Sequence, residues 1–91
     1  MFYERKDMTE FIATFHTHAD AILAHRTLSE EDVDARMMPV PRKLSSSCGT
    51  CVRYTAEKNF AEELKPADFE AIYTVEGIGK YAVSVKGEED D

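Results

Sequence analysis

The spacing of the apolar residues changes along this chain, and the order of those changes is what most constrains its fold. Residues 10–15, "EFIATF", form a short apolar run that predicts a buried strand. From Thr17 onward the apolar residues recur at helical spacing, with Thr17 as the predicted N-cap. Asp20 falls in the first turn of this helix, and His25 and Arg26 in its last turn, where their charges suit the helix dipole.

The later segments continue the alternation of strands and helices. A polar connector covers residues 29–35, and Pro39 and Pro41 suit the end or edge of the strand that follows it. Patterns of period two predict strands and a pattern of helical period predicts a second helix, which gives strands at 35–41, 51–55 and 68–76 and a helix at 56–64. Residues 80–85, after the "GIG" turn, can add a short edge strand.

This β-α-β-β-α-β order matches the ferredoxin-like motif. We therefore expect an α+β fold in which a four-stranded antiparallel sheet carries two helices on one face. The periodicities also predict which side chains form the core: Phe11, Ile12, Ile22, Leu23, Val52, Phe60, Leu64 and Ile72.

A chain of 91 residues has room for one hydrophobic core. We expect a single domain over residues 1–87 and an acidic tail at 88–91. The N-terminus has no apolar stretch of signal-peptide length, and no run approaches the roughly 20 apolar residues of a membrane span. These features predict a cytoplasmic protein with reduced cysteines and no membrane partner.

The distribution of charge separates one segment from the rest. The net charge of −7 argues against a nucleic-acid partner, because phosphate binding needs a basic surface. Residues 36–58, in contrast, carry five Lys or Arg residues against Glu57 alone. Both cysteines lie in this electropositive segment, although such a cluster is also common on a solvated surface.

The cysteines, Cys48 and Cys51, form a C-x-x-C motif in "SSSCGTCVRY". In the cytosol such a pair is more often catalytic, sulfur-carrying or metal-binding than a structural disulfide. Two cysteines cannot complete the four-ligand shell of structural zinc. A thioredoxin-type motif opens a helix, whereas the residues after Cys51 alternate as a strand does.

The loop before Cys48 is long for a hairpin connection. Its backbone N–H groups and hydroxyls can converge on one anion, and two basic residues add positive charge; the residues expected to stabilise a sulfur anion are Arg42, Lys43, Ser45, Ser46, Ser47 and Gly49. The alternative interpretation is a compact turn with no chemistry, in which the serines form local turns and Gly49 has a positive φ.

The stretch "MMPVPRKLSSSCGTCVRY", preceded by "FHTHADAILAHRTL", resembles a small bacterial family described as selenium/sulfur carrier protein-like. The resemblance covers roughly residues 11–75 and is most specific at residues 39–49. It implies a ferredoxin-like fold and a role in sulfur or selenium metabolism, with Cys48 as the carrier residue. Cys51 departs from the aliphatic residue expected in relatives, so it either resolves a persulfide or only packs inward.

Three functions remain open from the sequence. The first is a carrier that holds a persulfide on Cys48 and exchanges sulfur with a cysteine desulfurase or a sulfurtransferase-like protein. The second is a thiol-disulfide redox protein using Cys48 and Cys51 as its catalytic pair. The third is an interaction module with a metal site shared across a homodimer.

No cofactor is expected, because "GIG" at 77–79 lacks the spacing and the following helix of a phosphate-binding motif. His16, His18 and His25 are expected to be solvated. A mixed Cys/His metal site would require the junction around Thr17 to face the cysteine loop.

Overall fold

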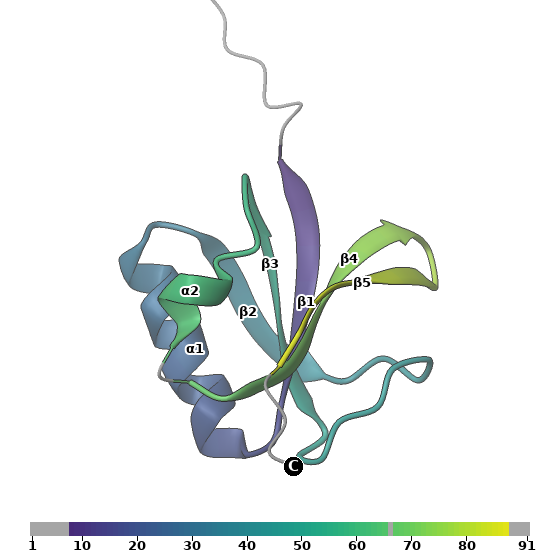
Figure 1. Ribbon diagram of the computed structural model, residues 1–91, viewed down its shortest axis with the longest axis horizontal. Helices are drawn as coiled ribbons and strands as arrows, with labels where there is room; N and C mark the ends of the chain where they lie inside the picture. Colours follow the sequence, from purple (N-terminus) through teal and green to yellow (C-terminus); the bar gives the residue numbers. More distant parts are fainter. Residues whose placement is uncertain (1–7, 66, 88–91) are drawn as a thin grey trace, which may run out of the picture.

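Within residues 8–65 and 67–87, which the computed structural model describes, five antiparallel strands form one sheet (Figure 1). The elements follow the order β1 (Thr9–Phe15), α1 (His18–Glu30), β2 (Asp34–Pro39), β3 (Thr50–Ala56), α2 (Ala61–Leu64), β4 (Phe69–Gly77) and β5 (Lys80–Lys86). The expected acidic tail at 88–91 lies outside the described residues. No helix in the described part of the chain is long and apolar enough to span a membrane.

The sheet has the order β2-β3-β1-β4-β5, with β1 at its centre. The α+β class and the order of the first six elements are as the sequence predicts, but the expected count of four strands is wrong. β5 is a full seven-residue strand that pairs with β4. Gly77 pairs with Lys80, which leaves Ile78 and Gly79 as a two-residue turn in which Gly79 has φ +71°. Such turns favour glycine at positive φ, and this one extends the sheet.

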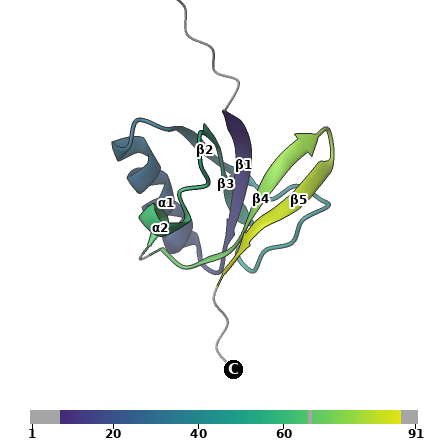
Figure 2. The ribbon, with the colours of Figure 1, turned by 45° about the horizontal axis from the view of Figure 1, so that its top comes forward.

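Both helices lie on the same side of the sheet, as the two views of the ribbon show (Figures 1 and 2). On that side the core combines alternate residues of β1 and β3 with one stripe of α1. The opposite side of the central strands is buried as well, because Ile12, Thr14 and Cys51 have no exposed surface. The middle of the sheet is therefore shielded on both faces.

Helix α1 begins as predicted, because the Thr17 side chain accepts a hydrogen bond from the Asp20 N–H at 3.1 Å. The helix continues to Glu30, so the prediction that His25 and Arg26 occupy its last turn is wrong. The last two residues of the helix, Ser29 and Glu30, are polar, and for this reason the sequence pattern there predicts a connector. The described residues of its last turn include no basic side chain.

Most of the predicted core is buried. Phe11, Ile12, Val52, Leu64 and Ile72 are buried, while Leu23 and Phe60 are half-buried and pack against the core. Ile22 is the exception, because 43% of its surface is exposed. The buried stripe of α1 consists of Ala21, Ala24 and Leu28. Ile22 is one position from that stripe, which rotates it by about 100° toward solvent.

Helix α2 is shorter than the predicted helix over residues 56–64. Ala56 instead ends β3, where it is buried in the core with the strand period. Phe60 has φ +59°, a left-handed conformation that interrupts any helix running through it. The Asn59 side chain accepts a hydrogen bond from the Ala61 N–H at 2.9 Å, so the helix begins only there. After Leu64 the extended Lys65 ends it, as expected for a residue before proline.

Two substitutions in α1 test this assignment of the core. Leu28→Ala should lower the free energy of unfolding by about 2 to 5 kcal/mol, because it removes a fully buried side chain and leaves a cavity. Ile22→Ala should change it by no more than about 0.5 kcal/mol, because Ile22 faces solvent. Urea unfolding followed by circular dichroism measures both. Equal losses in the two variants would show that the helix is rotated relative to the sheet.

Candidate functional site

The connection between β2 and β3, here called the cysteine loop, comprises residues 40–49. The Val40 N–H donates to the Gly49 carbonyl at 3.1 Å and closes the base of the loop. The Leu44 N–H donates to the Pro41 carbonyl at 3.0 Å and forms a turn within it. Gly49 has φ +78°, which the sequence anticipated for a compact turn. The loop is therefore an ordered structure that returns the chain to the start of β3.

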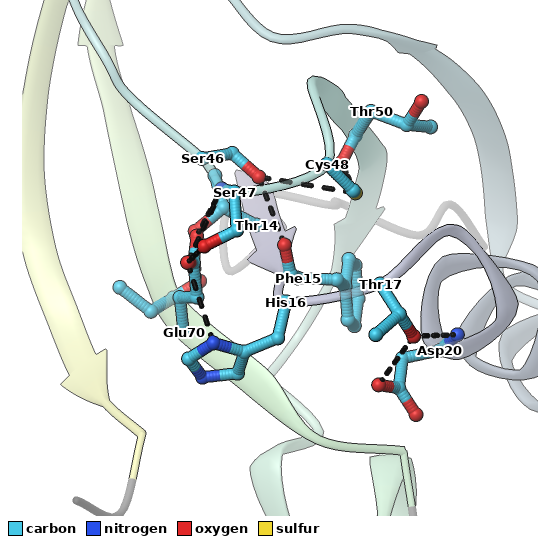
Figure 3. Close-up of polar contacts among 11 residues, drawn as sticks. Thr14, Phe15, His16, Thr17, Asp20, Ser46, Ser47, Cys48, Thr50 and Glu70 are labelled. Atoms are coloured by element: carbon cyan, nitrogen blue, oxygen red, sulfur yellow. Dashed lines mark hydrogen bonds and ion pairs between the residues drawn. The ribbon is translucent and has the colours of Figure 1, made fainter.

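Cys48 lies at the end of this loop and is half-buried. Its Sγ is 3.9 Å from Ser46 Oγ and 3.5 Å from the Thr50 carbonyl oxygen (Figure 3). Ser46 Oγ–H donates to the Phe15 carbonyl at 2.9 Å, which attaches the loop to the end of β1. The Ser46 oxygen can therefore accept the Cys48 S–H, and its proton can turn toward a sulfur anion instead.

Cys51 lies on the other side of the sheet. It alternates along β3 with Val52, which packs in the core beneath the helices, so its side chain points to the opposite face. It is fully buried, with Sγ 3.7 Å from the Pro39 carbonyl oxygen. Burial raises the pKa of the Cys51 thiol to about 11, although the nearby charge of Arg53 acts in the opposite direction.

The C-x-x-C motif consequently does not present its two sulfurs to one point. Cys48 packs against the core on the helical side of the sheet, whereas Cys51 belongs to the other face. Both thiols are free. A two-cysteine reaction would require the start of β3 to separate from its neighbours, because strand pairing on both edges fixes Cys51 on its face of the sheet.

Ser47, one of the residues expected to stabilise a sulfur anion, donates to a carboxylate of the chain instead. The Ser47 N–H donates to Glu70 Oε2 at 3.2 Å, and Ser47 Oγ–H donates to the same oxygen at 2.6 Å (Figure 3). His16 Nδ1 lies 3.4 Å from that oxygen on its other side. We call Ser47, Glu70 and His16 the clasp, because they join the cysteine loop to the start of β4.

The remaining predicted site residues are spread along the exposed part of the loop. Arg42, Lys43, Ser45 and Gly49 are exposed. Lys43 extends toward the β4–β5 turn, where its Nζ is 3.4 Å from the position that a Cβ on Gly79 would occupy. Among the predicted sulfur-stabilising residues, Ser46 is the one whose side chain contacts Cys48.

The junction around Thr17 does face the cysteine loop, which is the condition that a Cys/His metal site would require. His18 Nδ1 is 3.2 Å from Thr50 Oγ1, so both exposed histidines of the junction have partners in or beside the loop. His25 Nε2 is 3.1 Å from the Ala35 carbonyl oxygen and links α1 to β2. Within residues 8–65 and 67–87, however, no three His, Cys, Asp or Glu side chains are grouped to hold a metal ion.

Sequence reasoning missed Glu70. Its position beside Ser47 depends on the pairing of β1 with β4, in which Phe15 lies opposite Phe69 after an irregularity at Thr14. Ser47 and Glu70 are 23 positions apart in the sequence, and no local pattern connects them. The one available signal was that Glu70 is a charged residue near the start of a strand whose neighbours, Phe69 and Ala71, are buried.

Comparison with known proteins gives one match. A family model described as "Putative Se/S carrier protein-like" matches residues 10–74, from β1 through most of β4. The matched region contains the whole cysteine loop and every residue of the clasp. No curated protein matches the chain, and no solved structure matches it.

The placement of the two thiols predicts different reactivities. In the native protein, iodoacetamide at pH 8 should modify Cys48 and leave Cys51 unmodified. With a pKa of about 11, only about one Cys51 in a thousand is ionised at that pH, and the side chain is buried. Intact mass and peptide mapping count and locate the adducts. Cys48→Ser should show no adduct when native and one in urea, whereas rapid native modification of Cys51 would contradict this assignment.

Proposed function

This chain belongs to the Se/S carrier protein-like family, and we propose that it carries sulfur or selenium on Cys48 as a persulfide or its selenium equivalent. The observation that carries this proposal is the separation of the two cysteines. Cys48 is partly exposed at the end of an ordered loop, while Cys51 is buried on the opposite face of β3. That arrangement favours chemistry by one thiol.

The proposed reaction exchanges one S–S bond for another. The Cys48 thiolate attacks the terminal sulfur of a persulfide on a donor protein, the donor S–S bond breaks, and the donor thiolate leaves. Cys48 then holds the terminal sulfur as its own persulfide. An acceptor thiolate repeats the attack and regenerates the Cys48 thiolate. Each step conserves electrons, so the cycle needs no oxidant or cofactor.

The surroundings of Cys48 suit a group that alternates between neutral and anionic forms. Ser46 can accept the thiol proton, and its own hydroxyl can turn from the Phe15 carbonyl to donate to a sulfur anion. Apart from the neighbours of Gly49 in the chain, no described residue has an atom within 4 Å of the position that a Cβ on Gly49 would occupy, so the backbone beside Cys48 is open on that side. A partner can approach there without displacing a side chain.

The redox and metal alternatives have less support. A disulfide between Cys48 and Cys51 requires their side chains to meet, and β3 directs Cys51 to the other face. A metal site shared by the four cysteines of a homodimer would need both sulfurs of each copy on one surface, and Cys51 is fully buried. We therefore assign Cys51 a packing role. The partners that fit the carrier are a cytoplasmic cysteine desulfurase or a sulfurtransferase-like protein.

The basic residues of the loop are proposed to act through their long-range charge. Replacing Arg42 and Lys43 together with Glu should slow alkylation of Cys48 about two- to fivefold at low salt, because the charge of the loop becomes more negative beside a thiolate. The difference should shrink at about 1 M salt, where screening is strong. Rates that stay equal at low salt would show that these residues form only a solvated surface.

Sulfur loading tests the proposed function directly. After incubation with a cysteine desulfurase and cysteine, the intact mass of the chain should rise by that of one sulfur atom. A reductant should remove this sulfur, because the persulfide S–S bond is reducible. Cys48→Ser should abolish the gain and Cys51→Ser should preserve it, which makes the second variant the matched control.

A chain that acquires no sulfur on Cys48 from several donors, but readily forms an intramolecular disulfide, would support the redox alternative instead. Loss of a dimer on addition of a chelator would support the metal-bridged module. Selenocysteine can replace cysteine in the same assay, because the desulfurase then holds selenium at the persulfide oxidation level and can pass it on by the same exchange. The mass of the adduct determines which of the two elements Cys48 accepts.

A further inference from the structure

The clasp occupies the part of the cysteine loop that would otherwise be available to a sulfur anion. Ser47 directly precedes Cys48, and both its N–H and its hydroxyl donate to the carboxylate of Glu70. These are two of the groups that the sequence pattern predicts to stabilise the sulfur. In this structure the Ser47 N–H and hydroxyl stabilise the carboxylate of Glu70 instead.

Glu70 is held in place from several directions. His16, which follows β1, approaches the same oxygen that accepts both Ser47 hydrogen bonds. A hollow of about 450 Å³ beside Ser47 and Glu70 is also lined by Lys86 of β5, so a basic residue faces the same space as the carboxylate. The side chain of Glu70 is about one-fifth exposed, whereas that of His16 is nearly half exposed. The carboxylate is thus partly shielded from water.

We propose that Glu70 is a positioning residue for Cys48, which acts through Ser47 to keep the cysteine loop in a closed state of low reactivity. The inference deepens the proposed carrier function and rests on it for its biological purpose. Two effects combine. The hydrogen bonds fix the loop beside β4, and the carboxylate, held by the residue that directly precedes Cys48, opposes a second negative charge in the loop.

Release of Glu70 from Ser47 would reverse both effects. The Ser47 N–H and hydroxyl would become free to donate to sulfur, and the loop would lose one of its attachments. The Ser46 hydrogen bond to Phe15 is a separate attachment, so the loop would remain tied to β1. The structure thus allows Cys48 to gain donors without unfolding of the sheet.

The test compares the alkylation rate of Cys48 in the whole chain and three variants. Glu70→Gln keeps an acceptor for Ser47 but removes the charge, and should raise the rate about two- to fivefold at low salt. This gain should fall at about 1 M salt, because a charge effect is screened. Glu70→Ala removes both the charge and the acceptor, so its gain should be at least as large and should persist in salt.

Glu76→Gln is the matched control, because it removes one negative charge from an exposed position near the other end of the same strand. Its rate should equal that of the unchanged protein. Amide hydrogen exchange followed by NMR provides a second measurement, in which Glu70→Ala should accelerate exchange of the Ser47 N–H. Circular dichroism verifies that each variant is folded.

Glu70 variants whose Cys48 reacts no faster than the unchanged protein, or more slowly, would overturn the proposal. Unchanged exchange of the Ser47 N–H in Glu70→Ala would also overturn it. None of these measurements uses a sulfur donor. A failure of sulfur loading with faster alkylation in Glu70→Gln would therefore refute the carrier function and leave the role of Glu70 intact.

Discussion

The pairing of β1 on both of its edges is the constraint on which the rest of this structure depends. β1 forms antiparallel ladders with β3 and with β4, and five of its seven residues are fully or nearly fully buried. The groups that organise the site follow one another at its C-terminal end. The Phe15 carbonyl holds Ser46, His16 contacts Glu70, and Thr17 caps α1. The cysteine loop is thereby attached to the central, buried strand of the sheet.

The alternation of side chains along β3 explains why the two cysteines differ in accessibility. Cys51 lies within the strand and is assigned to one face, whereas Cys48 precedes the strand and follows the path of the loop. In a motif at a helix start, two residues three apart share a side of the helix. In an extended chain, two residues three apart point to opposite faces. The C-x-x-C motif of this chain therefore gives one partly exposed thiol and one buried thiol.

The features that were predictable from the sequence are those determined by local interactions. The N-cap of α1 needs only Thr17 and Asp20, and the strand period after Cys51 is visible in the sequence itself. Ala56 fits both the strand pattern before it and the helix pattern after it. In the structure it ends β3, where its side chain is buried in the core. Glu70 could not be found, because its contact with Ser47 depends on the register of β1 and β4. Hydrophobic alternation predicts a strand, but it does not identify which charged residue a neighbouring loop will meet.

The contacts that close the cysteine loop are weaker than those that hold the sheet. A typical hydrogen bond contributes about 0.5 to 1.5 kcal/mol, one to a charged group about 1.5 to 3 kcal/mol, and an exposed ion pair at most about 1 kcal/mol. Releasing the two Ser47 bonds and the His16 contact therefore costs a few kcal/mol, against roughly 5 to 15 kcal/mol for unfolding a domain. Local opening of that size is accessible while the rest of the protein stays folded. Because the Ser46 hydrogen bond to Phe15 is independent of Glu70, the environment of Cys48 can thus change without disturbing β3, on whose other face Cys51 remains buried.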